Sequence, residues 1–416
     1  MNLKPLVDGL PKGSVCPNCK KAVPFGVARC AFCGAEIIKK TEVDDSLLSK
    51  TGFDMIFISD PYNLRYFTGF RGGEGLALIT PREKVLLVDS RYTVAAKEET
   101  AEKGNEFKVF EFNNDNPKYK ILADIFVEYS DNILLVGFED KSITVGAFHE
   151  LSKGIHDAFN KYYSHMEAKN RNRQIEWRGL GDFLEQERMI KTPEEIEILR
   201  KAEAIGDAAF SDILGILKPG MTELEVAVEL EYSMKKRGAE GLSFDTIVAS
   251  GINSSMPHAI PGNKKIEVGD FVTMDFGCIY NGYCSDMTRT VVIGKASDEQ
   301  KKIYDIVLKA QLEAVAYIKA GLKCIDVDRV ARDIIAKEGY GEYFGHGLGH
   351  SVGLYIHESP ALNVRDETIL AEGMIETIEP GIYIPGFGGV RIEDMGAVTK
   401  DGYDNFASST KELVEI

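Results

Sequence analysis

Long apolar runs are missing from this 416-residue sequence. No run approaches the roughly 18 apolar residues that a membrane-spanning helix needs. The first residues, MNLKPLVDGLPKGSVCPNC, also lack the apolar core of a secretory signal. We therefore expect no membrane contact and a location in the cytoplasm.

Basic residues are scarce, because 49 Lys and Arg face 65 Asp and Glu and leave a net charge of -16. A general nucleic-acid binder would need a basic face, so we expect no nucleic acid among the partners. Tandem repeats of short period and low-complexity tracts are also absent. With 44% hydrophobic residues and this length, two or three globular domains are expected.

The seven cysteines are few and odd in number, but four of them form two CxxC pairs: Cys16, Cys19, Cys30 and Cys33. In a long chain without a secretory signal, this pattern indicates metal binding rather than a disulfide framework. Four thiolates can complete a tetrahedral zinc shell, and the metal would supply folding energy to so short a segment. We predict a zinc ribbon over residues 1–40 with one structural Zn²⁺. The alternatives are an iron site or a redox CxxC pair.

The next segment, residues 45–170, alternates apolar strand-like runs with helical stretches, as in an α/β domain. The candidate strands are Met55–Ser59, Gly75–Thr80, Lys84–Val88, Phe107–Phe112 and Asn132–Gly137. Helices are predicted over Thr93–Lys103 and Lys118–Tyr129. We find no catalytic cluster in this segment. Residues 166–191 are polar and are predicted to be a linker and a lead-in helix.

The last domain, residues 180–416, contains three capping-box signatures that predict helix starts. They are Thr192 with Glu195, Thr222 with Glu225, and Ser297 with Gln300. Strand-like runs lie between and after these helices, and the candidate catalytic residues lie in those runs.

A hairpin is predicted where Asn281-Gly282 separates Phe271–Tyr280 from Tyr283–Ile293, because Asn-Gly favours a two-residue type I′ turn. Tyr280 then faces Tyr283, and counting back places Gly277 opposite Asp286. Asp275 shares the face of Gly277, so Asp275 and Asp286 are diagonal neighbours roughly 7 Å apart. Two semi-buried carboxylates that close would repel unless cations lie between them, so we predict that both bind metal.

Two further carboxylates and one imidazole occur in similar contexts: Glu379, Glu393 and His350. Four carboxylates and one histidine would balance two divalent cations. An oxygen-rich set suits Mn²⁺, and the imidazole also admits Zn²⁺, Co²⁺ or Fe²⁺. Two such metals can polarise a carbonyl and ionise a water at neutral pH.

Seven motifs follow one another in an order that resembles the pita-bread metallopeptidases, which include Xaa-Pro aminopeptidase, prolidase and methionine aminopeptidase. The motifs are Ser250…Met-Pro-His258-Ala, Met-Asp275-Phe-Gly, Tyr-Cys-Ser-Asp286-Met-Thr-Arg, His346-Gly-Leu-Gly-His350, His357-Glu-Ser-Pro, Ile-Glu379-Pro-Gly-Ile-Tyr383 and Val-Arg391-Ile-Glu393-Asp. Tyr62-Asn-Leu-Arg-Tyr-Phe-Thr-Gly69 also resembles the creatinase-type N-terminal domain of the proline-specific members. The resemblance covers residues 45–416.

This resemblance implies an α+β fold: a pita-bread catalytic domain preceded by a creatinase-like α/β domain, with the zinc ribbon as an addition. It implies a peptidase that cuts short peptides with proline at the second position, and a homodimer. The implied metal ligands are Asp275, Asp286, His350, Glu379 and Glu393. Asp286 and Glu393 match the bridging positions, and Glu379 matches the proton shuttle.

The resemblance also assigns residues outside the metal shell. His258 and His357 match the two histidines that hold substrate and stabilise the tetrahedral intermediate. His346, Tyr383 and Arg391 match pocket or supporting residues. His346 as a satisfied buried histidine, and Arg391 as a plain ion-pair partner of a ligand carboxylate, are the structural alternatives.

Other readings fit less well. Gly349-His350-Ser351-Val-Gly353 matches the G-x-S-x-G of serine hydrolases, but only His357 follows Ser351, six residues on. His357-Glu358 lacks the second histidine of H-E-x-x-H. A non-catalytic pita-bread protein that binds partners through its ribbon, or a creatinase-like relative without metal, would show an eroded ligand set. All five ligand types are present here. The motifs leave open whether dipeptides or longer peptides are preferred.

The ribbon can be tested by deleting residues 1–40. Because four cysteines form a closed structural site, the deletion should remove one tightly held zinc per chain and leave peptidase activity largely intact. Metal analysis and peptide hydrolysis measure the two effects. Loss of activity in a chain that stays folded would make the ribbon part of the catalytic unit.

Overall fold

The computed structural model describes residues 14–15, 22–23, 46–104, 106–129, 134–163 and 175–416. Within these, the short strands β1 (Ser14–Val15) and β2 (Ala22–Val23) pair antiparallel. The four cysteines of the predicted zinc ribbon lie outside the described residues. The chain divides into two compact units, Met1–Asp182 and Phe183–Ile416.

The first unit contains a six-stranded sheet in the order β6-β5-β4-β3-β7-β8. β4 is antiparallel to both of its neighbours, and the other pairs are parallel. The strands are β3 (Met55–Ile58), β4 (Leu76–Ile79), β5 (Lys84–Asp89), β6 (Phe107–Phe112), β7 (Leu134–Phe138) and β8 (Ile175–Gly179). The helices are α1 (Ser46–Thr51), α2 (Pro61–Thr68), α3 (Thr93–Glu102), α4 (Lys118–Val127) and α5 (Val145–Tyr162). The five predicted strands and two predicted helices are confirmed, and each begins and ends within two residues of its predicted bounds.

One prediction for this region was wrong. Residues 166–191 were expected to hold only a linker and a lead-in helix, but Ile175–Gly179 forms β8, paired parallel to β7. Its side chains alternate between partly buried and exposed because β8 is an edge strand of the sheet. Ile175 and Trp177 pack on the core while Glu176 and Arg178 face water, so the strand carries no apolar run. The lead-in helix is present as α7 (Phe183–Met189).

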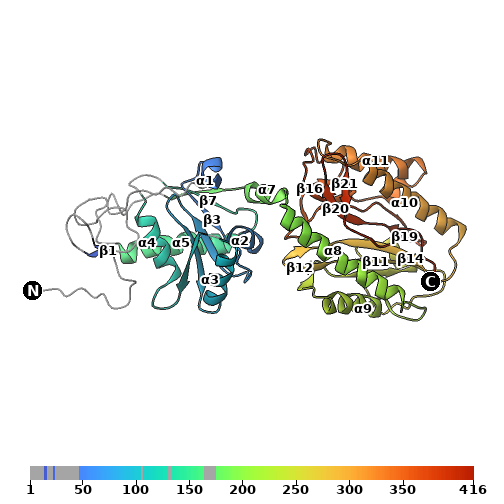
Figure 1. Ribbon diagram of the computed structural model, residues 1–416, viewed down its shortest axis with the longest axis horizontal. Helices are drawn as coiled ribbons and strands as arrows, with labels where there is room; N and C mark the ends of the chain where they lie inside the picture. The colour runs from blue at the N-terminus through green and yellow to red at the C-terminus, as the bar shows by residue number, and fades with distance from the viewer. Residues whose placement is uncertain (1–13, 16–21, 24–45, 105, 130–133, 164–174) are drawn as a thin grey trace, which may run out of the picture. The chain divides into compact units, whose positions relative to one another are not determined.

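The second unit places strands between two pairs of helices (Figure 1). The helices are α8 (Pro193–Leu214), α9 (Glu223–Lys236), α10 (Asp298–Tyr317) and α11 (Cys324–Lys337). All three predicted capping boxes are confirmed, at the starts of α8, α9 and α10. None of the helices in the described part of the chain is long and apolar enough to cross a membrane.

The strands of the second unit form several short sheets, and two of them build the floor of the cavity described below. One sheet has the order β10-β11-β14, and another has the order β16-β15-β17-β20-β21. The bounds are β9 (Gly241–Leu242), β10 (Ile247–Ser250), β11 (Phe271–Phe276), β12 (Cys278–Tyr280), β13 (Tyr283–Cys284), β14 (Met287–Val292), β15 (Gly349–Ser351), β16 (Glu358–Leu362), β17 (Ile375–Ile378), β18 (Gly381–Ile384), β19 (Gly388–Arg391), β20 (Asp394–Val398) and β21 (Tyr403–Asn405). The 3₁₀ turns are η1 (Gly251–Ser255) and η2 (Gly341–Tyr343).

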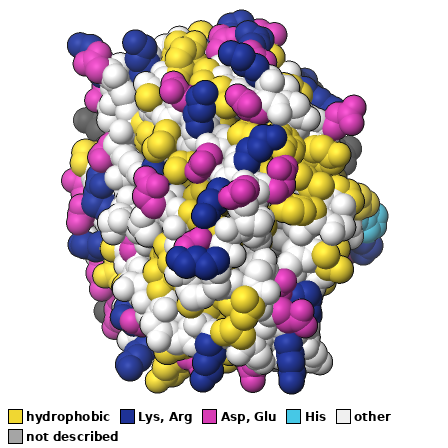
Figure 2. All heavy atoms as spheres, turned by 90° about the vertical axis from the view of Figure 1, so that its right-hand side faces the viewer, with side chains coloured by type: hydrophobic (Ala, Val, Ile, Leu, Met, Phe, Trp, Pro, Cys, Tyr) yellow, Lys and Arg dark blue, Asp and Glu magenta, His cyan; other side chains and the backbone are white. Residues whose placement is uncertain are grey.

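Two hydrophobic clusters divide the unit into halves. Residues of α8 and α9 pack with β10, β11 and β14 in one cluster. Residues of α10 and α11 pack mainly with β17, β18 and β19 in the other. An isolated antiparallel β-bridge between the backbones of Thr288 and Glu393 joins the two halves. On the face shown in Figure 2, basic and acidic side chains are interspersed, so neither charge forms a continuous patch there.

A buried ion pair ties β14 to β20 behind that bridge. The guanidinium of Arg289 donates to Asp394 Oδ1 at 2.7 Å, and both side chains are at most 1% exposed. Asp394 Oδ2 accepts further hydrogen bonds from Gln311, Asn405 and Lys411. Burial alone would raise the pKa of Asp394, but the charges of Arg289 and Lys411 outweigh it and lower that pKa.

We predict that Asp394→Asn lowers the free energy of unfolding by about 3–5 kcal/mol, because it leaves a buried cation without its partner. Asp404→Asn, which breaks the exposed pair with Arg200, should cost less than about 1 kcal/mol. Urea unfolding followed by circular dichroism measures both. Since the pKa of Asp394 is lowered by folding, its contribution should be present at neutral pH and disappear as the pH falls through that folded pKa. Equal losses in the two variants would contradict the prediction.

Candidate metal centre and active site

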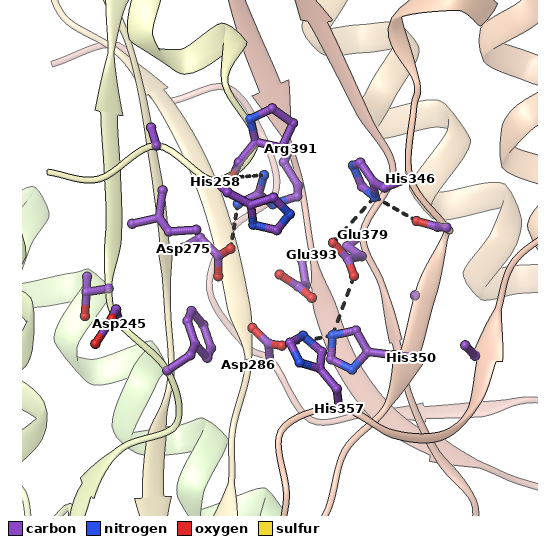
Figure 3. Close-up of a pocket in the computed structure, with 18 of the residues that line it drawn as sticks. Asp245, His258, Asp275, Asp286, His346, His350, His357, Glu379, Arg391 and Glu393 are labelled. Carbon is purple, nitrogen blue, oxygen red and sulfur yellow. Dashed lines mark hydrogen bonds and ion pairs between the residues drawn. The ribbon is translucent and has the colours of Figure 1, made fainter.

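A cavity of about 520 Å³ opens in the second unit, lined by residues from both halves. Nine of the ten residues predicted from the sequence for this site line the cavity: His258, Asp275, Asp286, His346, His350, His357, Glu379, Arg391 and Glu393. Tyr383, the tenth, lies behind them and contacts His346 and Arg391. Figure 3 shows the carboxylates directed toward one another in the centre of this group.

The predicted hairpin places the first two carboxylates. Tyr280 pairs with Tyr283, and the same register continues to Phe276 with Met287 and Asp275 with Thr288. The chain contains no bulge along this stretch, so the count that set Gly277 opposite Asp286 is confirmed. Asp275 at the end of β11 and Asp286 just before β14 are therefore diagonal neighbours whose side chains reach the same cavity.

The bridge between the two halves brings in Glu393. Thr288 pairs with Glu393, and the Thr288 hydroxyl donates to Glu393 Oε2 at 2.6 Å. Asp286, His350 and Glu393 each offer one atom to a group whose atoms all lie within 4.8 Å of one another, a spacing that can hold a metal ion. Asp286 and Glu393 are almost fully buried.

His350 and Glu379 complete the cluster from the second half. His350 Nε2 lies 3.4 Å from Asp286 Oδ2 and 3.6 Å from Glu379 Oε1. Its Nδ1 lies 3.1 Å from the Ser351 carbonyl, so a proton on Nδ1 would leave Nε2 facing the carboxylates. The backbone N–H of Glu379 donates to the Leu348 carbonyl, which ties the residue after β17 to the segment that carries His350.

The carboxylates of the cluster would be stabilised in their ionised form by nearby positive charge. Burial, together with neighbouring carboxylates, raises the pKa of Asp286, Glu379 and Glu393. Burial disfavours protonation of His350, but its hydrogen bond to Asp286 and the charge of Glu379 outweigh this and raise its pKa. Asp275 Oδ1 is buried and has no hydrogen-bond partner among the described residues. Convergent oxygens with an unsatisfied lone pair fit divalent metal ions.

The remaining predicted residues surround this cluster. The Arg391 guanidinium donates to Asp275 Oδ2 at 2.5 Å, to the Thr288 hydroxyl at 3.0 Å and to the Tyr383 hydroxyl at 2.9 Å. His346 Nε2 lies 2.9 Å from the same Tyr383 hydroxyl. Burial and the charge of Arg391 lower the pKa of His346 to about 4, so its imidazole is neutral at pH 7. His346 is therefore a hydrogen-bonded histidine, and Arg391 is an ion-pair partner of the Asp275 carboxylate.

His258 and His357 face the open part of the cavity. The His357 ring stacks edge-on against His350, with centroids 4.6 Å apart. His258 is exposed and follows η1, which is anchored because Glu223 at the start of α9 accepts hydrogen bonds from Ser250 and Asn253. Neither histidine is among the three residues, Asp286, His350 and Glu393, whose atoms lie within 4.8 Å of one another.

The sequence analysis missed Asp245, an exposed residue that also lines the cavity. It lies in Ser-Phe-Asp245-Thr-Ile, directly before β10. An acidic residue before a strand resembles any other surface Asp, so the local pattern holds no signal. Its nearness in sequence to Ser250…His258 was the one available clue.

Comparison with known proteins agrees with this geometry. Residues 197–400 match metallopeptidase family M24, and residues 45–175 match the creatinase/prolidase N-terminal domain. An Xaa-Pro dipeptidase of Pyrococcus furiosus is 39% identical over 368 residues, which cover 88% of this chain and 97% of that protein. The chain belongs to metallopeptidase family M24. The predicted combination of a creatinase-like domain and a pita-bread domain is confirmed.

Solved structures of family members share the fold over most of the chain. The Xaa-Pro dipeptidase from Bacillus anthracis is 41% identical with a TM-score of 0.79, covering 89% of this chain and 98% of that one. The X-Pro aminopeptidase from Thermotoga maritima is 35% identical with a TM-score of 0.78, covering 89% of this chain and 100% of that one. Residues 1–44 lie outside the family matches, because the creatinase/prolidase match begins at residue 45.

Asp286→Asn and Glu393→Gln test the carboxylate cluster of this M24 chain. Each replacement removes a negative charge at the centre of the group, so at least one metal per chain should be lost and turnover should fall at least about a hundredfold. Metal analysis and peptide hydrolysis measure the effects. Asp401→Asn, at an exposed residue outside the cavity lining, is the control. Near-normal metal content and rate in both variants would refute a metal site at these residues.

Proposed function

We propose that this chain is a metal-dependent peptidase that hydrolyses the bond between an N-terminal residue and proline. One observation carries the proposal: four carboxylates and one imidazole converge on a cavity that two further histidines border, and one buried carboxylate oxygen there has no partner among the described residues. The relatives described as an Xaa-Pro dipeptidase and an X-Pro aminopeptidase support the choice of substrate.

We propose that Asp275, Asp286, His350, Glu379 and Glu393 would hold two divalent ions, and Asp286 and Glu393 are the residues that match the family's bridging positions. The oxygen-rich set suits Mn²⁺, and the imidazole also admits Co²⁺, Zn²⁺ or Fe²⁺. When bound, such metals polarise the scissile carbonyl and make a water nucleophilic at neutral pH. The set contains no cysteine, and the three described cysteines are buried elsewhere.

The chain's own residues then position the substrate and move the proton. Glu379 is proposed to take the proton from the attacking water and pass it to the leaving proline nitrogen. His258 and His357 are proposed to hold the peptide and to donate hydrogen bonds to the developing oxyanion. Arg391 donates one hydrogen bond to the Tyr383 hydroxyl and is proposed to orient Asp275 through a second, charge-assisted hydrogen bond.

Proline is accepted for a physical reason. The bond before proline has no N–H, and the ring holds φ near -65°. A site that orients the bond through its carbonyl oxygen and the free α-amino group does not need that N–H. The ring can then fill an apolar part of the cavity.

Several further properties are proposed on the sequence evidence. They are a cytoplasmic location, a zinc ribbon at residues 1–40 with one structural Zn²⁺, a homodimer, and no nucleic-acid or membrane partner. A non-catalytic protein acting through its ribbon is disfavoured, because the five ligand side chains are all present and converge.

His258→Ala and His357→Ala separate substrate-binding from metal-binding residues. Each variant should keep its metals and lose turnover by roughly 2–4 kcal/mol of activation free energy, the cost of a missing hydrogen bond to an oxyanion. Metal content and kcat are measured on the same samples. Loss of metal in either variant would move that histidine into the ligand set.

The preference for proline predicts that an Xaa-Pro substrate outruns its Xaa-Ala counterpart by at least about tenfold in kcat/KM, on the order of 1.4 kcal/mol. N-acetylation of the substrate should abolish cleavage, because the amino group loses its charge and its contact. Steady-state rates on matched peptides, with each divalent metal added to stripped enzyme, provide the measurement. Equal rates on both peptides, or undiminished cleavage of the acetylated one, would leave a metal hydrolase but refute the proline aminopeptidase.

A further inference from the structure

One carboxylate in the cavity has no part in the proposed metal centre. The described lining residues include five carboxylates, of which Asp275, Asp286, Glu379 and Glu393 are the proposed ligands. The fifth, Asp245, is exposed. No hydrogen bond or ion pair joins the Asp245 side chain to another of the described residues. An acidic group without a partner inside a substrate cavity is available to a positive group on the substrate.

The charges around Asp245 favour a cationic partner. Four ligand carboxylates balance two divalent ions, so Asp245 remains as an additional negative charge. Arg391 is the one Lys or Arg among the described lining residues, and it donates to Asp275. Among the described lining residues, no Lys or Arg is therefore paired with Asp245. A cationic substrate group would gain most from this carboxylate, because a charge-assisted hydrogen bond is stronger than one from a neutral donor, and an acidic group would be repelled.

Asp245 lies at one edge of the carboxylate cluster, at the same wall of the cavity as Asp275. Ile247 pairs with Asp275 across β10 and β11, and Asp245 precedes Ile247 by two residues, a step of about 7 Å in extended chain. Figure 3 shows Asp245 on the side of Asp275 and Asp286, apart from the cluster and away from His346. Its carboxylate thus lines the cavity and is not one of the three groups, from Asp286, His350 and Glu393, whose atoms lie within 4.8 Å of one another.

Because Asp245 lies apart from the carboxylate cluster, only some parts of the substrate can reach it. With the scissile carbonyl at the metal centre, the α-amino nitrogen is only about 2.5 Å from the carbonyl carbon and stays at the centre. An extended Lys or Arg side chain places its charge about 6 Å or more from its Cα. The charged end of that side chain therefore extends further from the metal centre than the backbone amine does, toward outlying groups of the cavity such as Asp245. Phe244, which also lines the cavity, offers an apolar surface for the methylene stem.

We propose that Asp245 gives the site a preference for a basic residue, Lys or Arg, immediately before the proline. The inference rests on the proposed function and names its substrate class more closely: peptides that begin Lys-Pro or Arg-Pro. Asp245 acts in recognition, by a charge pair at a partly solvated site, so its effect should be moderate and sensitive to salt.

The test compares Lys-Pro-Ala with norleucine-Pro-Ala, whose side chains share the same stem and differ in the terminal ammonium. For the metal-loaded full chain, kcat/KM for the lysine peptide should exceed that for the norleucine peptide by at least about threefold at low salt, and added NaCl should reduce the ratio. In Asp245→Asn the ratio should fall to about one, and in Asp245→Glu it should be retained. Because each ratio is taken within one enzyme, differences in folding or metal content cancel.

Binding and control measurements sharpen the result. Free L-lysine should inhibit more strongly than L-norleucine, and Asp245→Asn should remove that difference. Asp401→Asn, an exposed carboxylate outside the cavity lining, should keep the wild-type ratio. A ratio near one in the wild type, or an unchanged ratio in Asp245→Asn, would overturn this proposal while cleavage of both peptides upholds the proposed function. Failure to cleave either peptide would overturn both.

Discussion

Mutual repulsion among buried carboxylates is the constraint on which this structure depends. Asp286 and Glu393 are almost completely removed from water, and Asp275 and Glu379 share their cavity. Burial, together with the charge of neighbouring carboxylates, raises the pKa of Asp286, Glu379 and Glu393, so positive charge is needed to keep these groups ionised. The protein supplies part of it through Arg391, which contacts Asp275, and leaves the centre to divalent ions. The chemistry proposed for the site is a consequence of that requirement.

The architecture holds the repelling groups in place by dividing them between two separately packed halves. Asp275 and Asp286 belong to a hairpin that packs against α8 and α9. His350, Glu379 and Glu393 belong to strands or turns of the half that packs against α10 and α11. The Thr288–Glu393 bridge and the Arg289–Asp394 ion pair then join the halves directly behind the cluster. The ligands thus lie in or next to strands, most of which contribute residues to the hydrophobic clusters of the unit.

Local rules explain where prediction from the sequence succeeded. A two-residue Asn-Gly turn leaves only one register for its strands, so the positions of Asp275 and Asp286 followed by counting. Capping boxes involve residues three apart, and all three were found where they were predicted. β8 was missed because an edge strand with one wet face has no apolar run, and its place in the sheet depends on β7, nearly forty residues earlier. The zinc ribbon rests on the spacing of four cysteines alone.

The sequence by itself determined which ligand side chains are present and how the two strands of the hairpin pair. It also determined which family the chain resembles, and that resemblance assigned the roles of the site residues. Only the tertiary structure decided that His350 Nε2 faces Asp286 and Glu379, that Thr288 meets Glu393, and that Asp245 enters the cavity. These contacts join residues that are 29 to 105 positions apart, or depend on how a strand end is packed. Periodicity and turn chemistry act over a few residues, whereas the position of a side chain in a cavity is set by the packing of two halves that no local pattern encodes.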